Sequence, residues 1–364
     1  MKYDSIIIGG GISGLVCGIK MLKAGKKVAI VSSGQSALHF NSGSIDLFGR
    51  KDGNDVKHPL DEIARVPEGH PYKKLGIDTV KKLIPEVKPL FAEAGITLVG
   101  KEDENHYRLT PTGIFKPAWM SMLDYVAVES AENLPWGKVA IINITGYLDF
   151  YPDFIERGLN QAGLECERRD FTIPELDTLR KSSTEMRATN IARFITGNVI
   201  KRFAAEVNRI VTETKADTVI MPAIIGLFDE EPVKLLKEQV KCPLYYVSTM
   251  PMSLCGMRAQ MRLRNHFQHL GGSYLLGDTV ASGEFDGSRL TSIRTVNLGD
   301  MTLEADQFVL ATGSFFSHGL EATPNKVFEP IFRLDVNVDG PRSGWCDIDL
   351  YNPQQYCLLY TSDA

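Results

Sequence analysis

The chain contains 364 residues, of which 43% are hydrophobic and 23% are charged. This composition is typical of a soluble globular α/β protein and excludes an intrinsically disordered chain, which would be poorer in apolar residues and richer in net charge. The 40 basic and 45 acidic residues leave a net charge of -5, which is too small to indicate nucleic acid as a partner.

The N-terminal segment predicts a nucleotide-binding unit. Gly9, Gly11 and Gly14 match G-x-G-x-x-G, and the residues around them predict strand, turn, helix and strand within ~30 residues, which is the context that the motif requires. The predicted bounds are 5–8 for the first strand, 15–24 for the helix and 27–31 for the second strand.

Each glycine has an expected role. Gly9 permits the tight turn, Gly11 lets the backbone approach a pyrophosphate, and Gly14 lets the helix pack closely on the sheet. The helix N-terminus offers free N–H groups to the anion, and Ser13 in the glycine turn is a further candidate contact. The alternative is that these glycines only turn the chain.

The end of the second strand departs from the usual pattern. An Asp or Glu normally stands there and binds the adenosine ribose, whereas this chain has Ser32. A serine supplies no carboxylate, so the grip on an adenine dinucleotide is weakened and the identity of the cofactor stays open. An NAD(P)-dependent reductase is the alternative class, disfavoured by Ser32 and by Lys26 and Lys27 before the strand.

A glycine- and serine-rich loop follows at residues 34–48, GQSALHFNSGSIDLF. Flavoproteins with two dinucleotide-binding domains use such a loop to wrap the ribityl and phosphate groups of the flavin, while an ordinary surface loop is the alternative. The candidate contacts from this loop are Gly34, Ser36, Ser42, Gly43 and Ser44.

The middle of the chain predicts a second α/β unit. Residues 80–94 have helical periodicity, 96–115 suggest a hairpin, 138–150 begin a strand-turn-helix unit and 218–226 predict a buried strand. The TGYLDF turn lacks a glycine trio, so we expect an ordinary strand-helix connection rather than a second nucleotide turn.

The C-terminal part returns to the nucleotide-binding pattern. A helix from residue 263 stops at Gly271 and Gly272, a strand runs to about Val280, and another strand occupies residues 302–310. An A-T-G turn follows at residues 311–313, where glycine again suits close approach of the backbone. The full set of candidate cofactor-binding residues is Gly9, Gly11, Ser13, Gly14, Ser32, Gly34, Ser36, Ser42, Gly43, Ser44, Val280, Thr312 and Gly313.

These elements predict a doubly wound α/β architecture: a Rossmann-like FAD/NAD(P)-binding flavoprotein fold of the two-dinucleotide-binding-domain type, with an inserted α/β cap domain. The predicted domains are residues 1–110 with 251–356 for the discontinuous flavin-binding domain and 111–250 for the cap. The last residues, 357–364, are expected to be a non-native tail.

Six cysteines are spread without a C-x-x-C pair, so no zinc ribbon or iron–sulfur binding run is encoded and no metal site is expected. This usage fits a reducing compartment. The N-terminus lacks a signal-peptide pattern, and no apolar stretch approaches the ~20 residues that would span a bilayer.

Five segments together resemble the B subunit of the anaerobic glycerol-3-phosphate dehydrogenase. They are GGGISGLVCG, GQSALHFNSGSIDLF, ELDTLRKSSTEMRATNIARF at 175–194, MPMSLCGMRAQ at 250–260 and ATGSFFSHGL. The resemblance runs from Met1 to about Tyr356. Members continue beyond this point into a glycine-rich segment, whereas this chain ends in CLLYTSDA, so we expect a truncated reading frame with a foreign tail.

The resemblance implies a flavin subunit, described for the family as FMN-binding with FAD as the alternative, of a complex that oxidises sn-glycerol 3-phosphate to dihydroxyacetone phosphate. It implies electron transfer to membrane quinone and on to fumarate or nitrate. It also implies two partners: the A subunit, which is a larger flavoprotein, and the C subunit, which is an iron–sulfur protein that holds the complex on the cytoplasmic face of the membrane.

The sequence does not identify a catalytic base. His39 in the flavin loop is a weak candidate, and a packed histidine is the alternative. Arg258, like Arg187 and Arg193, could clamp a substrate phosphate or form a structural ion pair. The protein could oxidise substrate itself, relay electrons from the partner flavin, or be a scaffold that has lost its flavin.

Overall fold

The structure is a computed structural model and describes residues 1–41, 43–181, 186–250, 252–323, 326–334 and 336. The candidate Ser42 and the predicted tail 357–364 lie outside these residues. The chain divides into two compact units. Unit 1 contains Met1–Leu38 and Leu263–Ala364, and unit 2 contains His39–Arg262.

The breaks between the units differ from the domain boundaries predicted at 110/111 and 250/251. They lie after Leu38 and after Arg262. The reason is strand pairing, because β3 (Ser44–Ile45) and β6 (Leu98–Val99) are hydrogen-bonded to β9 (Met120–Met122). Whether residues 39–110 also contribute to flavin binding stays a prediction.

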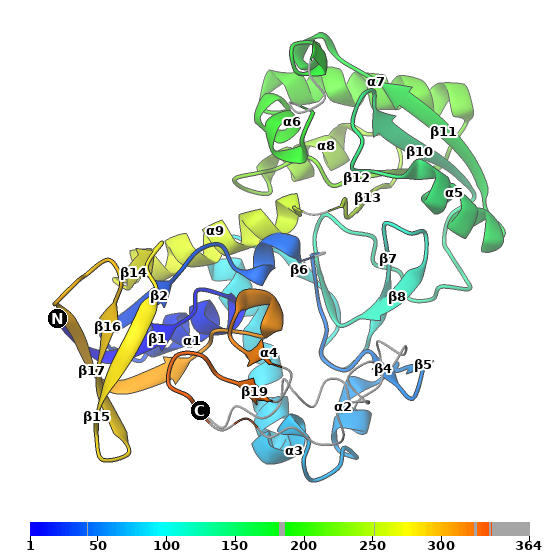
Figure 1. Cartoon of the computed structure of the whole chain (residues 1–364). Coiled ribbons are helices and arrows are strands. Elements are labelled where there is room, and N and C mark those ends of the chain that lie inside the picture. Colours follow the sequence, from blue (N-terminus) through cyan, green and yellow to red (C-terminus); the bar gives the residue numbers. More distant parts are fainter. Residues whose placement is uncertain (42, 182–185, 251, 324–325, 335, 337–364) are drawn as a thin grey trace. The chain divides into compact units, whose positions relative to one another are not determined.

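Unit 1 is built on a six-stranded sheet in the order β14-β2-β1-β17-β16-β15. The first four strands run parallel, and β16 and β15 continue the sheet antiparallel. Figure 1 shows how the blue N-terminal strands lie beside the yellow and orange strands from the last third of the chain. The strands are β1 (Lys2–Ile8), β2 (Val28–Ser32), β14 (Ser273–Leu276), β15 (Val280–Asp286), β16 (Arg289–Thr295) and β17 (Thr302–Leu310).

The centre of this sheet is apolar on both faces. Ile6 and Ile8 of β1 join a core with Val31 and Leu303, while Ile7 lies on the side of helix α1 (Ile12–Lys23). α1 packs on β1 and β2. A strand that is buried on both faces has a continuous run of apolar, often β-branched residues in its sequence, which explains the SIII segment.

Unit 2 contains a four-stranded parallel sheet in the order β11-β10-β12-β13. Helices α5 and α7 pack on β10 and β11. α7 buries Ile200, Phe203, Val207 and Ile210, a spacing that places one apolar face on the sheet. The elements are β10 (Lys138–Ile144), α5 (Pro152–Gln161), β11 (Glu165–Phe171), α6 (Ala188–Phe194), α7 (Asn198–Thr214), β12 (Thr218–Pro222), α8 (Glu231–Gln239) and β13 (Leu244–Val247).

The rest of unit 2 consists of short strands and helices. Its antiparallel sheet has the order β3-β9-β6, and β4 with β5 and β7 with β8 form two separate hairpins. The remaining elements are β4 (Arg50–Lys51), β5 (Asn54–Asp55), α2 (Pro59–Ile63), α3 (Pro71–Leu75), α4 (Ile77–Glu93), β7 (His106–Leu109) and β8 (Phe115–Ala118). Helix α9 (Leu254–His269) runs through the boundary into unit 1.

Most predicted elements agree with the structure within a few residues, and three differ. The helix predicted to start at residue 263 starts at Leu254, in α9. The hairpin predicted over 96–115 pairs β7 with β8, while β6 pairs with β9 instead. The strand predicted to run to Val280 ends at Leu276, because Gly277 adopts a φ of +78° and turns the chain before β15. None of the described helices is long and apolar enough to cross a bilayer.

Candidate functional site

A cavity of about 580 Å3 in unit 1 lies where β1, β2 and β17 end and where the chain turns between β14 and β15. Its walls are residues 8–13, 31–38, 278–281, 311–313, 316–318, 321 and 330–331. In open α/β sheets the carboxyl ends of parallel strands are where ligands bind. The cavity therefore has the position expected of a nucleotide site.

The cavity collects most of the predicted cofactor residues. Those that line it are Gly9, Gly11, Ser13, Ser32, Gly34, Ser36, Val280, Thr312 and Gly313. Gly14 lies behind the turn, where it packs rather than lining the cavity. Gly43 and Ser44 belong to unit 2.

Two glycines of the motif are required by the packing of the protein. Gly9 has a φ of +118°, and a Cβ atom there would lie 2.1 Å from the carbonyl oxygen of Ala311. A Cβ atom on Gly14 would lie 2.0 Å from the carbonyl oxygen of Gly9. Both positions need glycine because backbone comes too close for any side chain.

Gly11 is different, because neither packing nor backbone geometry requires a glycine there. Its φ of -76° and ψ of -175° suit any residue, and the nearest described atom to an added Cβ would be Cβ of Ser36 at 3.7 Å. Gly11 faces the cavity at the N-terminus of α1, where no side chain of the described residues caps the helix. Open space and uncapped N–H groups fit a phosphate group at this point.

The main chain of Ser32 connects β2 with the turn between β14 and β15. Its carbonyl oxygen accepts hydrogen bonds from the N–H groups of Gly277 (2.8 Å) and Asp278 (3.2 Å). Its hydroxyl donates to the carbonyl oxygen of Gly34 at 3.0 Å. Ser32 thus fixes the turn that brings residues 278–281 to the cavity wall.

The A-T-G turn closes another wall of the cavity. The N–H of Ala311 donates to the carbonyl oxygen of Ile8 at 2.8 Å, so this turn lies against the glycine turn. Gly313 has a φ of +85°, and the hydroxyl of Ser317 donates to the carbonyl oxygen of Thr312 at 2.7 Å. The sequence predicted a turn directly after the strand at 302–310, and the turn follows β17; its role in cofactor binding stays a prediction.

The sequence analysis did not identify several residues of the cavity wall. These residues are Asp278, Thr279, Ala281, Phe316, Ser317, His318, Glu321, Pro330 and Ile331. The Gly277-Asp278 pair was a usable signal, because Gly and Asp are turn residues and here they interrupt an apolar run. The residues after 315 gave no comparable signal.

The loop from His39 to Ser44 is held inside unit 2. The N–H of Ser253 donates to the carbonyl oxygen of His39 at 2.9 Å, and Nδ1 of His39 lies 2.5 Å from Oε1 of Gln260. The carbonyl oxygen of Gly43 accepts from the N–H of Met122 at 2.8 Å. His39 is only 9% exposed, so the structure shows it as a packed histidine with a fixed partner.

Position 43 needs a glycine because the side chain of Tyr125 covers the loop there. Its φ is +82°, and an added Cβ atom would lie 1.8 Å from Cε2 of Tyr125. Burial raises the pKa of the Tyr125 hydroxyl well above its usual value, so the ring is held as a neutral phenol. The loop conformation therefore depends on direct contact between the Gly43 backbone and this ring.

Arg258 forms a buried ion pair in unit 2. Its guanidinium lies 2.6 Å from Oδ1 of Asp124 and donates to the carbonyl oxygen of Gly226 at 2.5 Å. The side chain has no exposed surface, so the structure shows the ion-pair alternative and does not present Arg258 to a substrate phosphate. Of the other two arginines, Arg187 pairs with Asp149 at 3.2 Å.

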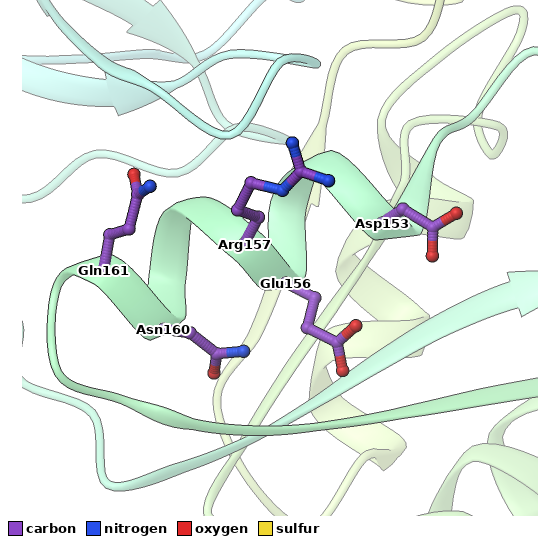
Figure 2. Close-up of a pocket in the computed structure, with 5 residues that line it drawn as sticks. All are labelled: Asp153, Glu156, Arg157, Asn160 and Gln161. Atoms are coloured by element: carbon purple, nitrogen blue, oxygen red, sulfur yellow. The ribbon is translucent and has the colours of Figure 1, made fainter.

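A shallow depression on α5 has a different character. Its walls are the side chains of Asp153, Glu156, Arg157, Asn160 and Gln161, which extend from several sides of one helix instead of converging (Figure 2). Asp153 and Glu156 both pair with Arg168. We interpret this depression as a solvated helix surface and not as a site.

The parallel strands, the glycine turn and the cavity at their ends define a Rossmann-like α/β fold. A family model described as "FAD binding domain" matches residues 4–359. The class is therefore that of flavoproteins with a mixed α/β fold.

Curated relatives identify the family more closely. A Yersinia pestis protein named as the B subunit of anaerobic glycerol-3-phosphate dehydrogenase matches at 41% identity, covering 98% of this chain and 85% of the relative. A protein of the same name from Haemophilus influenzae matches at 34% identity over 98% of this chain and 86% of its own length. The chain belongs to the family of anaerobic glycerol-3-phosphate dehydrogenase B subunits, and it is a flavin-containing oxidoreductase subunit.

Among solved structures, 3-ketosteroid Δ1-dehydrogenase from Sterolibacterium denitrificans overlaps with a TM-score of 0.38 at 14% identity. The overlap covers 86% of this chain and 48% of the other. A TM-score and a sequence identity this low support no statement about this chain.

Proposed function

We propose that this protein takes part in the oxidation of sn-glycerol 3-phosphate to dihydroxyacetone phosphate, with electrons passed to a membrane quinone and on to fumarate or nitrate. Gly11 is the observation that carries the flavin part of the proposal, because an approaching ligand accounts for a glycine that neither packing nor backbone geometry requires. The names of relatives at 34–42% identity support the substrate.

We further propose that the bound flavin is FAD. The family model is that of an FAD-binding domain, and the FMN prediction is not confirmed. The cavity supports the larger cofactor, because it extends from the glycine turn past the end of β2 to residues 278–281. This extension offers room for the adenosine half, which FMN lacks.

The residues of unit 1 would hold the cofactor in three ways. The N-terminus of α1 would receive the diphosphate, with Gly11 and Ser13 at the closest approach. The A-T-G turn would enclose the cofactor from the β17 side, and Val280 would lie along the adenosine half. Acceptance of hydride from a secondary alcohol is the chemistry that a bound flavin supplies.

The partners and the location are proposals of the same kind. We propose that the A subunit, which is a larger flavoprotein, and the C subunit, which carries iron–sulfur clusters, complete the complex. The iron–sulfur protein would hold the complex at the cytoplasmic face of the membrane. The relatives are named as B subunits, which supports an assembly of several chains. The electron-relay role and the role of substrate oxidant are both compatible with this assembly.

The first experiment is the visible absorption spectrum of the purified chain, with mass identification of the cofactor that heat releases. FAD with bands near ~370 and ~450 nm supports the proposal. FMN would overturn the choice of FAD, and a colourless chain that binds neither flavin would overturn the flavin function. Addition of glycerol 3-phosphate without oxygen then separates the roles. Bleaching of the chain alone supports a substrate oxidant, and bleaching only in the presence of the larger flavoprotein supports a relay.

A further inference from the structure

The missing acid at the end of β2 leaves a question about cofactor recognition. In Rossmann-like domains that carboxylate accepts hydrogen bonds from the adenosine ribose. Ser32 occupies the position, and its hydroxyl donates to Gly34 while lying beneath Gly10, where an added Cβ would be 2.5 Å from Oγ. A different acceptor is therefore needed if the adenosine half is bound.

Asp278 stands next to this position in space although it lies far away in the sequence. Its backbone N–H donates to the carbonyl oxygen of Ser32 at 3.2 Å, and the residue is part of the cavity wall. The residue is only 4% exposed. The turn between β14 and β15 thus brings a carboxylate to the end of β2, where the strand itself has none.

The Asp278 carboxylate is held in one orientation. Its Oδ1 atom accepts hydrogen bonds from the N–H groups of Thr279 at 2.8 Å and Asn297 at 3.0 Å. Oδ2 accepts no hydrogen bond from any residue that the structure describes. A fixed carboxylate with one oxygen still able to accept is suited to a ligand that carries O–H or N–H donors.

The described wall of the cavity has one other carboxylate, Glu321, but that side chain is exposed and follows the A-T-G turn. It belongs to the β17 side of the cavity. Asp278 is therefore the acceptor on the β2 side.

We infer that Asp278 replaces the missing β2 carboxylate and binds the donor groups of the adenosine half, which makes it the residue that selects FAD over FMN. The inference rests on the proposed FAD function. It explains how this chain can bind an adenine dinucleotide with a serine at the end of β2. The recognised chemistry is the set of ribose hydroxyl and adenine amino donors, which FMN does not carry.

The test compares the affinities of the full chain for FAD and for FMN, each measured by quenching of flavin fluorescence on titration into apoprotein. Asp278→Asn is the informative variant, because its amide oxygen can keep the two backbone hydrogen bonds of Oδ1 while the second carboxylate oxygen is lost. Asp286→Asn is the matched control, because it makes the same substitution at an exposed carboxylate of β15 that is not part of the cavity wall. Thermal melting of the apoproteins shows whether each variant is folded.

We expect Asp278→Asn to weaken FAD binding by about tenfold or more and to leave FMN binding unchanged, since a hydrogen bond to a charged group has about this value. Asp286→Asn should change neither affinity by more than a small factor. Unchanged FAD affinity in a folded Asp278→Asn protein overturns the inference and leaves the flavin function intact. Equal weakening of FAD and FMN also overturns it, because the effect would then be structural.

The wild-type chain provides the remaining arm of the test. A wild-type protein that binds FMN but not FAD overturns both this inference and the choice of FAD. Failure of the wild-type chain to bind either flavin overturns the proposed function itself. Competition by ADP, which carries the adenosine half without the flavin, should be strong in the wild type and weak in Asp278→Asn.

Discussion

Nη2 of Arg258 lies 2.6 Å from Oδ1 of Asp124, and the two side chains are 0% and 1% exposed. Burial alone would lower the pKa of Arg258, but Asp124 more than offsets it, so the guanidinium stays charged. The pair connects α9 with the segment that follows β9, and the thiol of Cys255 adds a contact of 3.3 Å to Asp124. Arg258, which the sequence suggested as a candidate for substrate binding, therefore forms a buried ion pair with Asp124 instead.

Removal of one member of this pair should be costly. We expect Arg258→Met to lower the free energy of unfolding by about 3–5 kcal/mol, because Asp124 is left as an uncompensated buried charge. The double variant Asp124→Leu/Arg258→Met should recover most of the loss, since apolar residues of similar size avoid the desolvation cost. Urea unfolding measures both. A double variant as unstable as Arg258→Met would contradict this account.

Two glycines of the motif should affect different properties: Gly11 should affect flavin binding and Gly14 should affect stability. Gly11→Ala should lower stability by no more than about 1 kcal/mol, the scale of a helix-cap substitution, yet weaken flavin binding by about tenfold or more. Gly14→Ala should instead lower stability by about 1–3 kcal/mol, because its Cβ meets the Gly9 carbonyl. Urea unfolding of the apoproteins and flavin titration measure the two effects. Full flavin affinity in Gly11→Ala would remove the main support for the phosphate position.

A comparison of alanine variants at Gly43 and Gly53 separates the cost of backbone strain from the cost of a clash with a side chain. Both have positive φ, +82° and +79°, but only Gly43 has a neighbour, the Tyr125 ring, within 4 Å of an added Cβ. Gly53→Ala should lose about 1–2 kcal/mol from the left-handed conformation. Gly43→Ala should lose about 1–3 kcal/mol more from overpacking. Equal losses in thermal or urea unfolding would show that the ring moves aside freely.

His106 should make the stability of unit 2 depend on pH. Burial, followed by the nearby cations Arg108, Lys57 and Lys88, lowers the pKa of His106 to about 4. Between pH 6.5 and 4 the unfolded chain binds the proton and the folded chain does not, so stability falls as the pH falls. The loss from this residue is at most about 3 kcal/mol over this window.

The variant His106→Asn should flatten the fall in stability between pH 6.5 and 4 when unfolding by urea is measured at several pH values. It also loses the hydrogen bond of Nε2 with the Ser121 hydroxyl (2.7 Å), so its stability at neutral pH should be lower. His269→Gln is the control, because that histidine is exposed. An unchanged slope in His106→Asn would assign the acid sensitivity to other groups.

Local patterns predicted a large part of the fold. The SIII run, the glycine spacing and the helical periodicity of residues 15–24 depend on neighbours along the chain, so β1, α1 and β2 were predicted within a few residues. The prediction of one strand running to Val280 was wrong, because a glycine turn interrupts an otherwise apolar run. The pairing of β3 and β6 with β9 joins segments far apart in the sequence, which no local pattern encodes.

The sequence by itself determined the nucleotide-binding class, because a turn that brings backbone close to backbone needs glycine at fixed spacing. Gly9 and Gly14 are the glycines that satisfy this requirement. Only the tertiary structure decided which charged residues face the cavity and which are buried in the core. Arg258 is enclosed with Asp124, while Asp278 is carried to the end of β2 by a turn that hydrogen-bonds to Ser32. Side-chain partners across such distances depend on how the chain packs, and packing is a property of the folded chain as a whole.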